Sequence, residues 1–459
     1  MFNYDLAVIG SGPGGRGAAI QGAKLGKKVA VIEQQSLLGG VSVNTGTIPS
    51  KALRQAILYL TGHFQRGIYG GNSQLKQQIT ISDLNVHTQK IVEERVITLE
   101  NQYKRNNVDI HFGKASFIGP HQLKIDHGLS SQSISASTII IATGSRPARS
   151  KTVPINQVNI LDSDGILELT KIPDSLVVVG GGIIGMEYAS FFSTLGTKVT
   201  VLDLQENILP FLDTEMSIAL QHHLQRNGVV FHLGEMVTKV TQRSGRIKTL
   251  SDKNNVVYSE ALLYAIGRVG MIEELGLTSL GIESDIRGRI HVNENFQTKI
   301  SHVYAVGDVI GAPALAATSQ EQGRCATRHA FGLNNNRIGA LLPIGVYTIP
   351  EISMVGQTEI ELREHSIPYE VGIGKYEDTA RGKILGDSSG KLKLLFNSEN
   401  RKLLGVHIIG EGASELVHIG QIGLAMGTEL DYFVDNVFNY PTLAECYRIA
   451  ALDALNKLS

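Results

Sequence analysis

The stretch that decides the fold runs from Tyr4 to Gln34 and reads YDLAVIGSGPGGRGAAIQGAKLGKKVAVIEQ. It contains an apolar run rich in β-branched residues, a glycine-rich turn, a segment with helical periodicity, and a second apolar run ending at Glu33. A strand, a helix and a parallel strand in this order form the βαβ unit that binds dinucleotides.

The same pattern occurs a second time. Ser175 to Gln205 reads SLVVVGGGIIGMEYASFFSTLGTKVTVLDLQ, and its second apolar run ends at Asp203. A single glycine-rich motif can be an ordinary turn without a ligand. Two copies with the same spacing from first glycine to terminal acid make that alternative weak, so the sequence predicts two dinucleotide-binding units.

Each glycine of the motif has its own role. The first permits a tight turn, the second lets the backbone approach a pyrophosphate, and the third lets the helix pack against the strands. The terminal acid can accept the ribose hydroxyl groups. We therefore assign cofactor binding to Gly10, Gly12, Gly15 and Glu33 in the first unit, and to Gly180, Gly182, Gly185 and Asp203 in the second.

Further apolar runs fit the same plan. TIIIATG ends at Gly144 and ALLYAIG ends at Gly267, and each can close a nucleotide-binding module. We include Thr143, Gly144 and Gly267 among the cofactor-binding residues. A third run, HVYAVGD, places Asp308 at the end of a buried strand.

The remaining segments differ in character. Residues from Ser50 to about Arg105 are predicted to be mostly helical. Beyond about Leu342, strand-like alternation begins at Tyr347, and helical segments follow from Gly412 and again from Thr442. The predicted fold class is therefore α/β, with two doubly wound Rossmann-like nucleotide-binding domains plus a C-terminal α+β domain.

Composition narrows the class of protein. A chain of 459 residues is expected to form two or three domains. A net charge of −1 gives no reason to expect nucleic acid or an anionic membrane as a partner. We see no signal peptide, no apolar run long enough to span a membrane and no metal-ligand spacing of histidines. With only two cysteines, the chain is expected to be cytoplasmic.

The chain resembles the flavoprotein disulfide reductase family. The resemblance rests on the two fingerprints above, the IPSK segment at Ile48, the VYAVGD strand and the PTLAE segment at Pro441. It implies FAD on residues 1–148 and 268–342, a nicotinamide nucleotide on residues 149–267, and a homodimer formed through residues 343–459.

The departures from the family pattern concern its redox disulfide. The segment reads GGVSVNTGTIPSK, so Ser42 and Thr47 occupy the two cysteine positions. The family's catalytic histidine is replaced by Tyr440. Hydroxyl groups cannot form a disulfide. The thiol relay is therefore missing, whereas the flavin and nucleotide parts are retained.

One branch of this family, the soluble pyridine nucleotide transhydrogenases, is similar in the IPSK segment and at the C-terminal end, although the first cysteine that is common in that branch is Ser42 here. The chain has GTIPSKALR from Gly46 and FNYPTLAECYR from Phe438, both of which are typical of that branch. The resemblance implies a transfer of hydride between nicotinamide nucleotides through flavin N5. The cofactors expected are FAD and NAD(H), with NADP(H) as a further substrate.

The resemblance also implies roles for single residues. Lys51 is expected beside flavin N5, paired with Glu187, although a purely structural ion pair is the alternative. Asp308 is expected to bind the FAD ribityl chain or to cap a helix. Ala317 belongs to a helix whose N-terminus faces the flavin. The residues expected to be catalytic are Lys51, Glu187, Tyr440 and Glu445, with Thr47 near the cofactor; for Tyr440, interface packing is an equal alternative.

Two other functions remain open from the sequence. The chain can be an NADH oxidoreductase that reduces a quinone or another acceptor, or a redox-responsive protein that binds FAD and NAD with little turnover. Asp203 favours NADH over NADPH, because a 2′-phosphate would lie beside its carboxylate and no arginine follows the strand.

Overall fold

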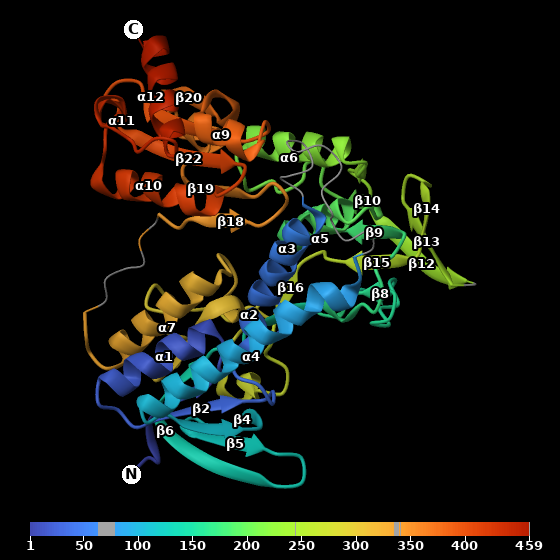
Figure 1. Cartoon of the computed structure of the whole chain (residues 1–459). Helices are drawn as coiled ribbons and strands as arrows, with labels where there is room; N and C mark the ends of the chain where they lie inside the picture. The colour runs from blue at the N-terminus through green and yellow to red at the C-terminus, as the bar shows by residue number, and fades with distance from the viewer. Residues whose placement is uncertain (63–78, 244, 335–338, 340, 459) are drawn as a thin grey trace. The chain divides into compact units, whose positions relative to one another are not determined.

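A computed structural model describes residues 1–62, 79–243, 245–334, 339 and 341–458 (Figure 1). The chain forms two compact units. The first comprises Met1–Leu53, Asn85–Ala148 and Gly267–Gly339, and the second comprises Arg54–Leu84, Arg149–Ile266 and Ala340–Ser459. Each unit contains one of the two predicted βαβ motifs.

The first unit is built on a parallel sheet. Its strands follow the order β3-β2-β1-β6, and β17 pairs in parallel with the outer side of β6. Helices α1 and α7 pack on each other beside this sheet (Figure 1). The bounds are β1 (Tyr4–Ile9), α1 (Pro13–Lys24), β2 (Val29–Glu33), β3 (Asp109–Phe112), β6 (Ser131–Ile141), β17 (Val303–Ala305) and α7 (Ala316–Ala330).

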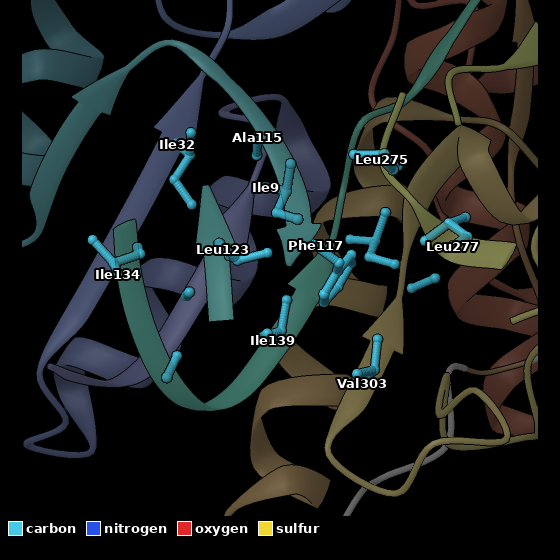
Figure 2. Close-up of a cluster of buried hydrophobic side chains, with 14 of the residues drawn as sticks. Ile9, Ile32, Ala115, Phe117, Leu123, Ile134, Ile139, Leu275, Leu277 and Val303 are labelled. Carbon is cyan, nitrogen blue, oxygen red and sulfur yellow. The ribbon is translucent and has the colours of Figure 1, made fainter. Parts of the chain in front are cut away.

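An antiparallel extension enlarges this sheet. Strand β6 continues past the parallel core and pairs with β5 (Gln122–Asp126), which pairs in turn with β4 (Lys114–Gly119). Figure 2 shows apolar side chains from both parts, such as Ile9 and Leu123, in one buried cluster. Burial of these side chains from water stabilises the layer that carries the first glycine-rich turn.

Among the described residues, three helices lie between β2 and β3 along the chain. They are α2 (Gly40–Asn44), α3 (Thr47–Thr61) and α4 (Ile81–Arg105), and they confirm the helical prediction wherever residues are described. Two short strands of the first unit, β7 (Ser145–Pro147) and β16 (Arg268–Gly270), form a separate antiparallel pair.

The second unit contains the other βαβ motif. Its parallel sheet has the order β11-β10-β9-β15-β8, and an antiparallel sheet β12-β13-β14 lies in the same segment. The bounds are β8 (Ile160–Leu161), β9 (Ser175–Val179), α5 (Ile183–Thr194), β10 (Lys198–Asp203), α6 (Thr214–Arg226), β11 (Val230–Leu233), β12 (Val237–Arg243), β13 (Arg246–Ser251), β14 (Val256–Ser259) and β15 (Ala261–Tyr264).

The C-terminal part is an antiparallel sheet with helices. The strand order is β18-β19-β22-β21-β20, and α12 packs on β20 and β21. The bounds are β18 (Ile344–Val346), β19 (Ile352–Gly356), α8 (Glu359–Glu364), β20 (Tyr369–Lys375), α9 (Ala380–Leu385), β21 (Lys391–Asn397), β22 (Leu403–Ile409), α10 (Ala413–Met426), α11 (Leu430–Asp435) and α12 (Glu445–Leu458).

The predicted fold class is thus confirmed: two α/β nucleotide folds are followed by an α+β segment. Within the described ranges, no helix has both the length and the apolar character that a membrane crossing requires.

Candidate functional site

The first glycine-rich turn connects β1 to α1. Gly10 has φ of 104°, which favours glycine, and a Cβ on Gly15 would lie 1.9 Å from the Gly10 carbonyl oxygen. These two glycines are therefore required by the protein's own packing. A Cβ on Gly12 would meet only Gly40 Cα, at 3.9 Å. The space in front of Gly12 is left open, as a pyrophosphate requires.

Glu33 lies at the end of β2 and is 5% exposed. Its carboxylate accepts hydrogen bonds from the backbone N–H of Ser11 at 3.0 Å, from Ser11 Oγ at 2.6 Å and from Gln35 N at 2.9 Å. Ser11 Oγ accepts in turn from Gly39 N at 2.9 Å. Hydrogen bonds from the glycine-rich turn thus hold the acid that the sequence predicts to bind ribose.

A cavity of about 220 Å³ opens beside this turn. The N-terminus of α1 faces it without a side-chain cap, so its first N–H groups can receive an anion. The lining residues are Ser11, Gly12, Pro13, Arg16, Gly39, Ser42, Val43, Thr47, Ile48, Arg95, Leu99, Ala316, Ala317 and Gln320.

Two arginines in this cavity were missed by the sequence reasoning. Arg16 donates a hydrogen bond to Gln320, and Arg95 Nε is buried without a hydrogen-bond partner among the described residues. Burial lowers the pKa of Arg16, and the nearby charge of Arg95 lowers it further. Two unneutralised guanidinium groups fit a diphosphate. The position of Arg16, directly after the third glycine, was the available signal.

Two predicted FAD ligands lie at the ends of neighbouring strands. Thr143 follows β6, and its buried Oγ1 has no hydrogen-bond partner in the described structure. Asp308 follows β17 and accepts a hydrogen bond from Ser145 Oγ at 2.7 Å. Ala317 lies in the first turn of α7 and lines the cavity. Together with the open turn and the two arginines, these residues fit a bound dinucleotide.

The second turn repeats the geometry of the first. A Cβ on Gly185 would lie 1.9 Å from the Gly180 carbonyl oxygen, whereas one on Gly182 would meet nothing within 4 Å. Asp203 at the end of β10 accepts from Gly181 N and from Gln205 N. Gly182 is also the uncapped N-terminal residue of α5. The second motif therefore also leaves room for a pyrophosphate at a helix N-terminus.

Two family models match the chain. Residues 4–323 match the pyridine nucleotide-disulphide oxidoreductase model, and residues 342–451 match the dimerisation domain of the same family. The chain belongs to the pyridine nucleotide-disulphide oxidoreductase family. Membership implies FAD and a nicotinamide nucleotide as cofactors, and the dimerisation domain supports a homodimer.

Individual relatives agree with this assignment. The chain is 52% identical to a soluble pyridine nucleotide transhydrogenase of Mycobacterium bovis, over 100% of this chain and 98% of that one. It is 42% identical to a protein of the same name from Colwellia psychrerythraea, over 100% and 99% of the two chains. The crystal structure of LpdA from Mycobacterium tuberculosis has a TM-score of 0.90 at 24% identity and covers 97% and 99% of the two chains.

The family's disulfide position holds hydroxyl groups here. Ser42 in α2 donates a hydrogen bond to the Gly39 carbonyl oxygen at 3.2 Å, and both Ser42 and Thr47 line the cavity. Cys325 and Cys446 are both buried, and neither lines the cavity. Burial raises the pKa of Cys325, and it raises that of Cys446 to about 12. Neither of the two positions at which the family resemblance expects a redox cysteine holds a thiol in this chain.

Lys51 and Glu187 each have defined neighbours. Lys51 Nζ donates to Ser50 Oγ at 3.2 Å. Glu187 is 3% exposed, and its Oε1 accepts from Tyr347 N at 2.9 Å. The pairing of Lys51 with Glu187 that the family resemblance implies stays a prediction.

The other predicted residues are spread over the chain. Gly144 and Gly267 both have positive φ, at 72° and 128°. Tyr440 is 69% exposed. Glu445 begins α12, and its Oε2 is buried without a hydrogen-bond partner among the described residues. The catalytic roles of Tyr440 and Glu445 also stay predictions.

A buried charge cluster in the second unit lies outside the predicted site. Lys393 is fully buried, with Nζ 3.0 Å from both carboxylate oxygens of Asp213 and 3.2 Å from Glu215 Oε2, and it also pairs with Glu359. These three carboxylates have metal-like spacing, but the ammonium group of Lys393 already lies among them. We therefore interpret the cluster as structural. It joins Asp213 to Lys393, which lie 180 positions apart in the sequence.

Proposed function

We propose that this chain is an FAD-dependent pyridine nucleotide transhydrogenase. When bound, FAD supplies the two-electron carrier, which takes hydride from a reduced nicotinamide and gives it to an oxidised one. The observation that carries the proposal is the pair of intact nucleotide turns combined with Ser42 and Thr47 in the disulfide position. Relatives named soluble pyridine nucleotide transhydrogenase, at 42% and 52% identity over the full length of this chain, support it.

The protein's own residues would act mainly by binding and orientation. Gly12 and the α1 N-terminus would hold the FAD pyrophosphate, assisted by Arg16 and Arg95. Glu33 would accept hydrogen bonds from the ribose of FAD, and Asp308 would bind its ribityl chain. Gly182 and the α5 N-terminus would hold the pyrophosphate of the exchangeable nucleotide.

The domain limits and the remaining assignments belong to the same proposal. We assign FAD to residues 1–148 and 268–342, the nicotinamide nucleotide to 149–267, and dimerisation to 343–459. Lys51, paired with Glu187, would place a positive charge beside the flavin and stabilise negative charge that develops there. Tyr440 and Glu445 would complete the site from the partner subunit. We also propose a cytoplasmic location, supported by two free, buried cysteines.

The test is nucleotide-to-nucleotide transfer by the purified holoenzyme. We expect NADPH to reduce thio-NAD⁺, with the parallel double-reciprocal plots of an alternating mechanism. A Cys325→Ala, Cys446→Ala variant should retain this transfer, because no thiol takes part. Failure of wild-type protein to transfer hydride between nucleotides would refute the proposal.

One observation favours a second function, an NADH oxidoreductase with a quinone or another acceptor. Asp203 and the exposed Glu206 place negative charge where a 2′-phosphate would bind. Rapid quinone reduction by NADH, without any transfer to a nucleotide, would support this alternative.

A further inference from the structure

A transhydrogenase that uses both nicotinamide nucleotides must accept a 2′-phosphate at the end of β10. The segment after Asp203 reads LQENILPFL and offers no cation, while Glu206 adds a negative charge. Like charges at this range oppose binding of a phosphate. If the proposed function holds, a positive group from elsewhere in the chain must compensate.

The turn between β13 and β14 reaches this edge of the sheet. It contains Asp252, Lys253 and Asn254. Met236 N donates to Asp252 Oδ1 at 3.0 Å, and Asp252 N donates to the Met236 carbonyl oxygen at 2.9 Å. The turn is therefore held on the segment that follows β11.

That segment is held in turn on the end of β10. Gly234 N donates to the Gln205 carbonyl oxygen at 3.0 Å, and Glu235 N donates to that of Asp203 at 2.9 Å. Backbone hydrogen bonds thus connect the Lys253 turn to Asp203 through one intermediate segment. The turn is fixed relative to the ribose-binding acid.

The position of the ammonium group follows from Gly234. A Cβ placed on Gly234 would lie 3.6 Å from Lys253 Nζ and also 3.6 Å from Glu206 Cγ. Lys253 and Glu206 therefore flank the same glycine, at the edge where β10 ends. Both side chains are exposed, so a ligand can reach them.

Lys253 is not required as a partner for the buried acid nearby. The Glu235 carboxylate accepts from Ser251 Oγ at 2.7 Å and from Asn255 Nδ2 at 2.9 Å. Among the described residues, Lys253 forms no ion pair within 4.0 Å. Its charge is therefore available to a ligand.

We propose that Lys253 is the residue that admits the 2′-phosphate of NADP(H) to this site. The ammonium group offsets the charges of Asp203 and Glu206 and contributes one charge-assisted hydrogen bond to the phosphate. His232 on β11 lies with its Nδ1 3.6 Å from Glu235 Oε1, so its side chain is directed to that buried acid. This inference rests on the proposed function, because it explains how one site serves both nucleotides.

The direct test measures binding without any redox step. The holoenzyme is titrated by calorimetry with ADP-ribose and with 2′-phospho-ADP-ribose, which differ only in the phosphate. In the Lys253→Gln variant, we expect the Kd for 2′-phospho-ADP-ribose divided by the Kd for ADP-ribose to rise about tenfold relative to wild type. Lys248→Gln removes another exposed lysine from the same hairpin, and it should leave this ratio as in wild type.

The outcomes separate the inference from the function on which it rests. An unchanged ratio of the two Kd values in Lys253→Gln, or an equal weakening of both ligands, overturns the role of Lys253 even if the enzyme transfers hydride. A selective loss of the phosphorylated ligand supports that role. In wild-type protein, absence of nucleotide-to-nucleotide transfer refutes the proposed function without changing the binding ratio.

Discussion

The two βαβ units use the same turn but hold their terminal acid differently. Glu33 is buried and accepts three hydrogen bonds, one of them from the side chain of Ser11. At the matching position, Gly181 replaces Ser11, and Asp203 is only partly buried. The first acid belongs to a closed polar network, whereas the second lies at an accessible edge.

This difference matches two kinds of ligand. A resident cofactor gains from a pre-organised, buried acceptor, because its binding site requires no rearrangement. An exchangeable nucleotide must leave in every cycle, so an accessible edge with few fixed contacts is better suited to it. The same motif can therefore bind a cofactor permanently in one unit and an exchangeable nucleotide in the other.

The largest effect is expected from the buried cluster that anchors the second unit. Replacing Lys393 with Met should lower the free energy of unfolding by about 3–5 kcal/mol, because Asp213 is left buried without its counter-ion. The matched change Lys391→Met, at a partly exposed pair with Glu215, should cost under about 1 kcal/mol. Denaturant titration measures both. If both variants lose the same free energy of unfolding, burial does not determine how much these ion pairs stabilise the fold.

The next effect tests the buried acid directly. Glu33→Gln should weaken FAD binding roughly 100-fold, since hydrogen bonds to a charged acceptor are each worth about 1.5–3 kcal/mol. Asp203→Asn should leave FAD fully bound and change nucleotide KM by only a few-fold. Flavin absorbance after gel filtration gives the first value and steady-state kinetics the second. If the Glu33→Gln variant keeps its full flavin absorbance after gel filtration, the proposed difference between Glu33 and Asp203 is wrong.

A smaller effect is expected at the middle glycines. Gly12→Ala should weaken FAD binding, and Gly182→Ala should weaken nucleotide binding, each about tenfold, because the added Cβ occupies ligand space. Neither change should alter the unfolding midpoint of the protein measured without bound ligand, because the added Cβ meets no close protein atom. Gly185→Ala is the control, because its Cβ would meet the Gly180 carbonyl oxygen and should destabilise the fold itself.

The smallest effect concerns pH. Burial pushes the pKa of Glu359 upward, but hydrogen bonds from Lys393 and Tyr369 outweigh it and hold the pKa below its usual 4.5. The stabilisation from this group is therefore present above its unfolded pKa and is lost as pH falls through the lowered folded value. Wild-type protein should lose this increment in acid, and Lys393→Met should lose less of it. Unfolding curves at several acidic pH values provide the measurement.

The sequence predicted the parts of the site that local pattern determines. The strands β1, β2, β9 and β10 coincide with the apolar runs, and both turns have the expected geometry. Ala317 also lies in a helix, α7, as the family resemblance implied. In these places, residues close in the chain make the decisive contacts, so spacing alone is informative.

The parts that sequence missed depend on distant pairs. Arg95 reaches the first cavity from α4, and Lys393 meets Asp213 across 180 positions. Lys253 reaches the end of β10 only because two hydrogen-bonded segments bring its turn there. No local periodicity encodes such contacts, and the sequence showed only that no arginine follows the strand that ends at Asp203.

The burial of both cysteines has a consequence for life under oxidative stress. Thiolate is the form that peroxides and electrophiles attack, and a raised pKa keeps Cys325 and Cys446 protonated. Ser42 and Thr47 stand at the positions where the family resemblance expects the redox cysteines, and neither reagent modifies a hydroxyl group readily. Reagents that attack thiols should therefore not block the hydride transfer proposed for this chain.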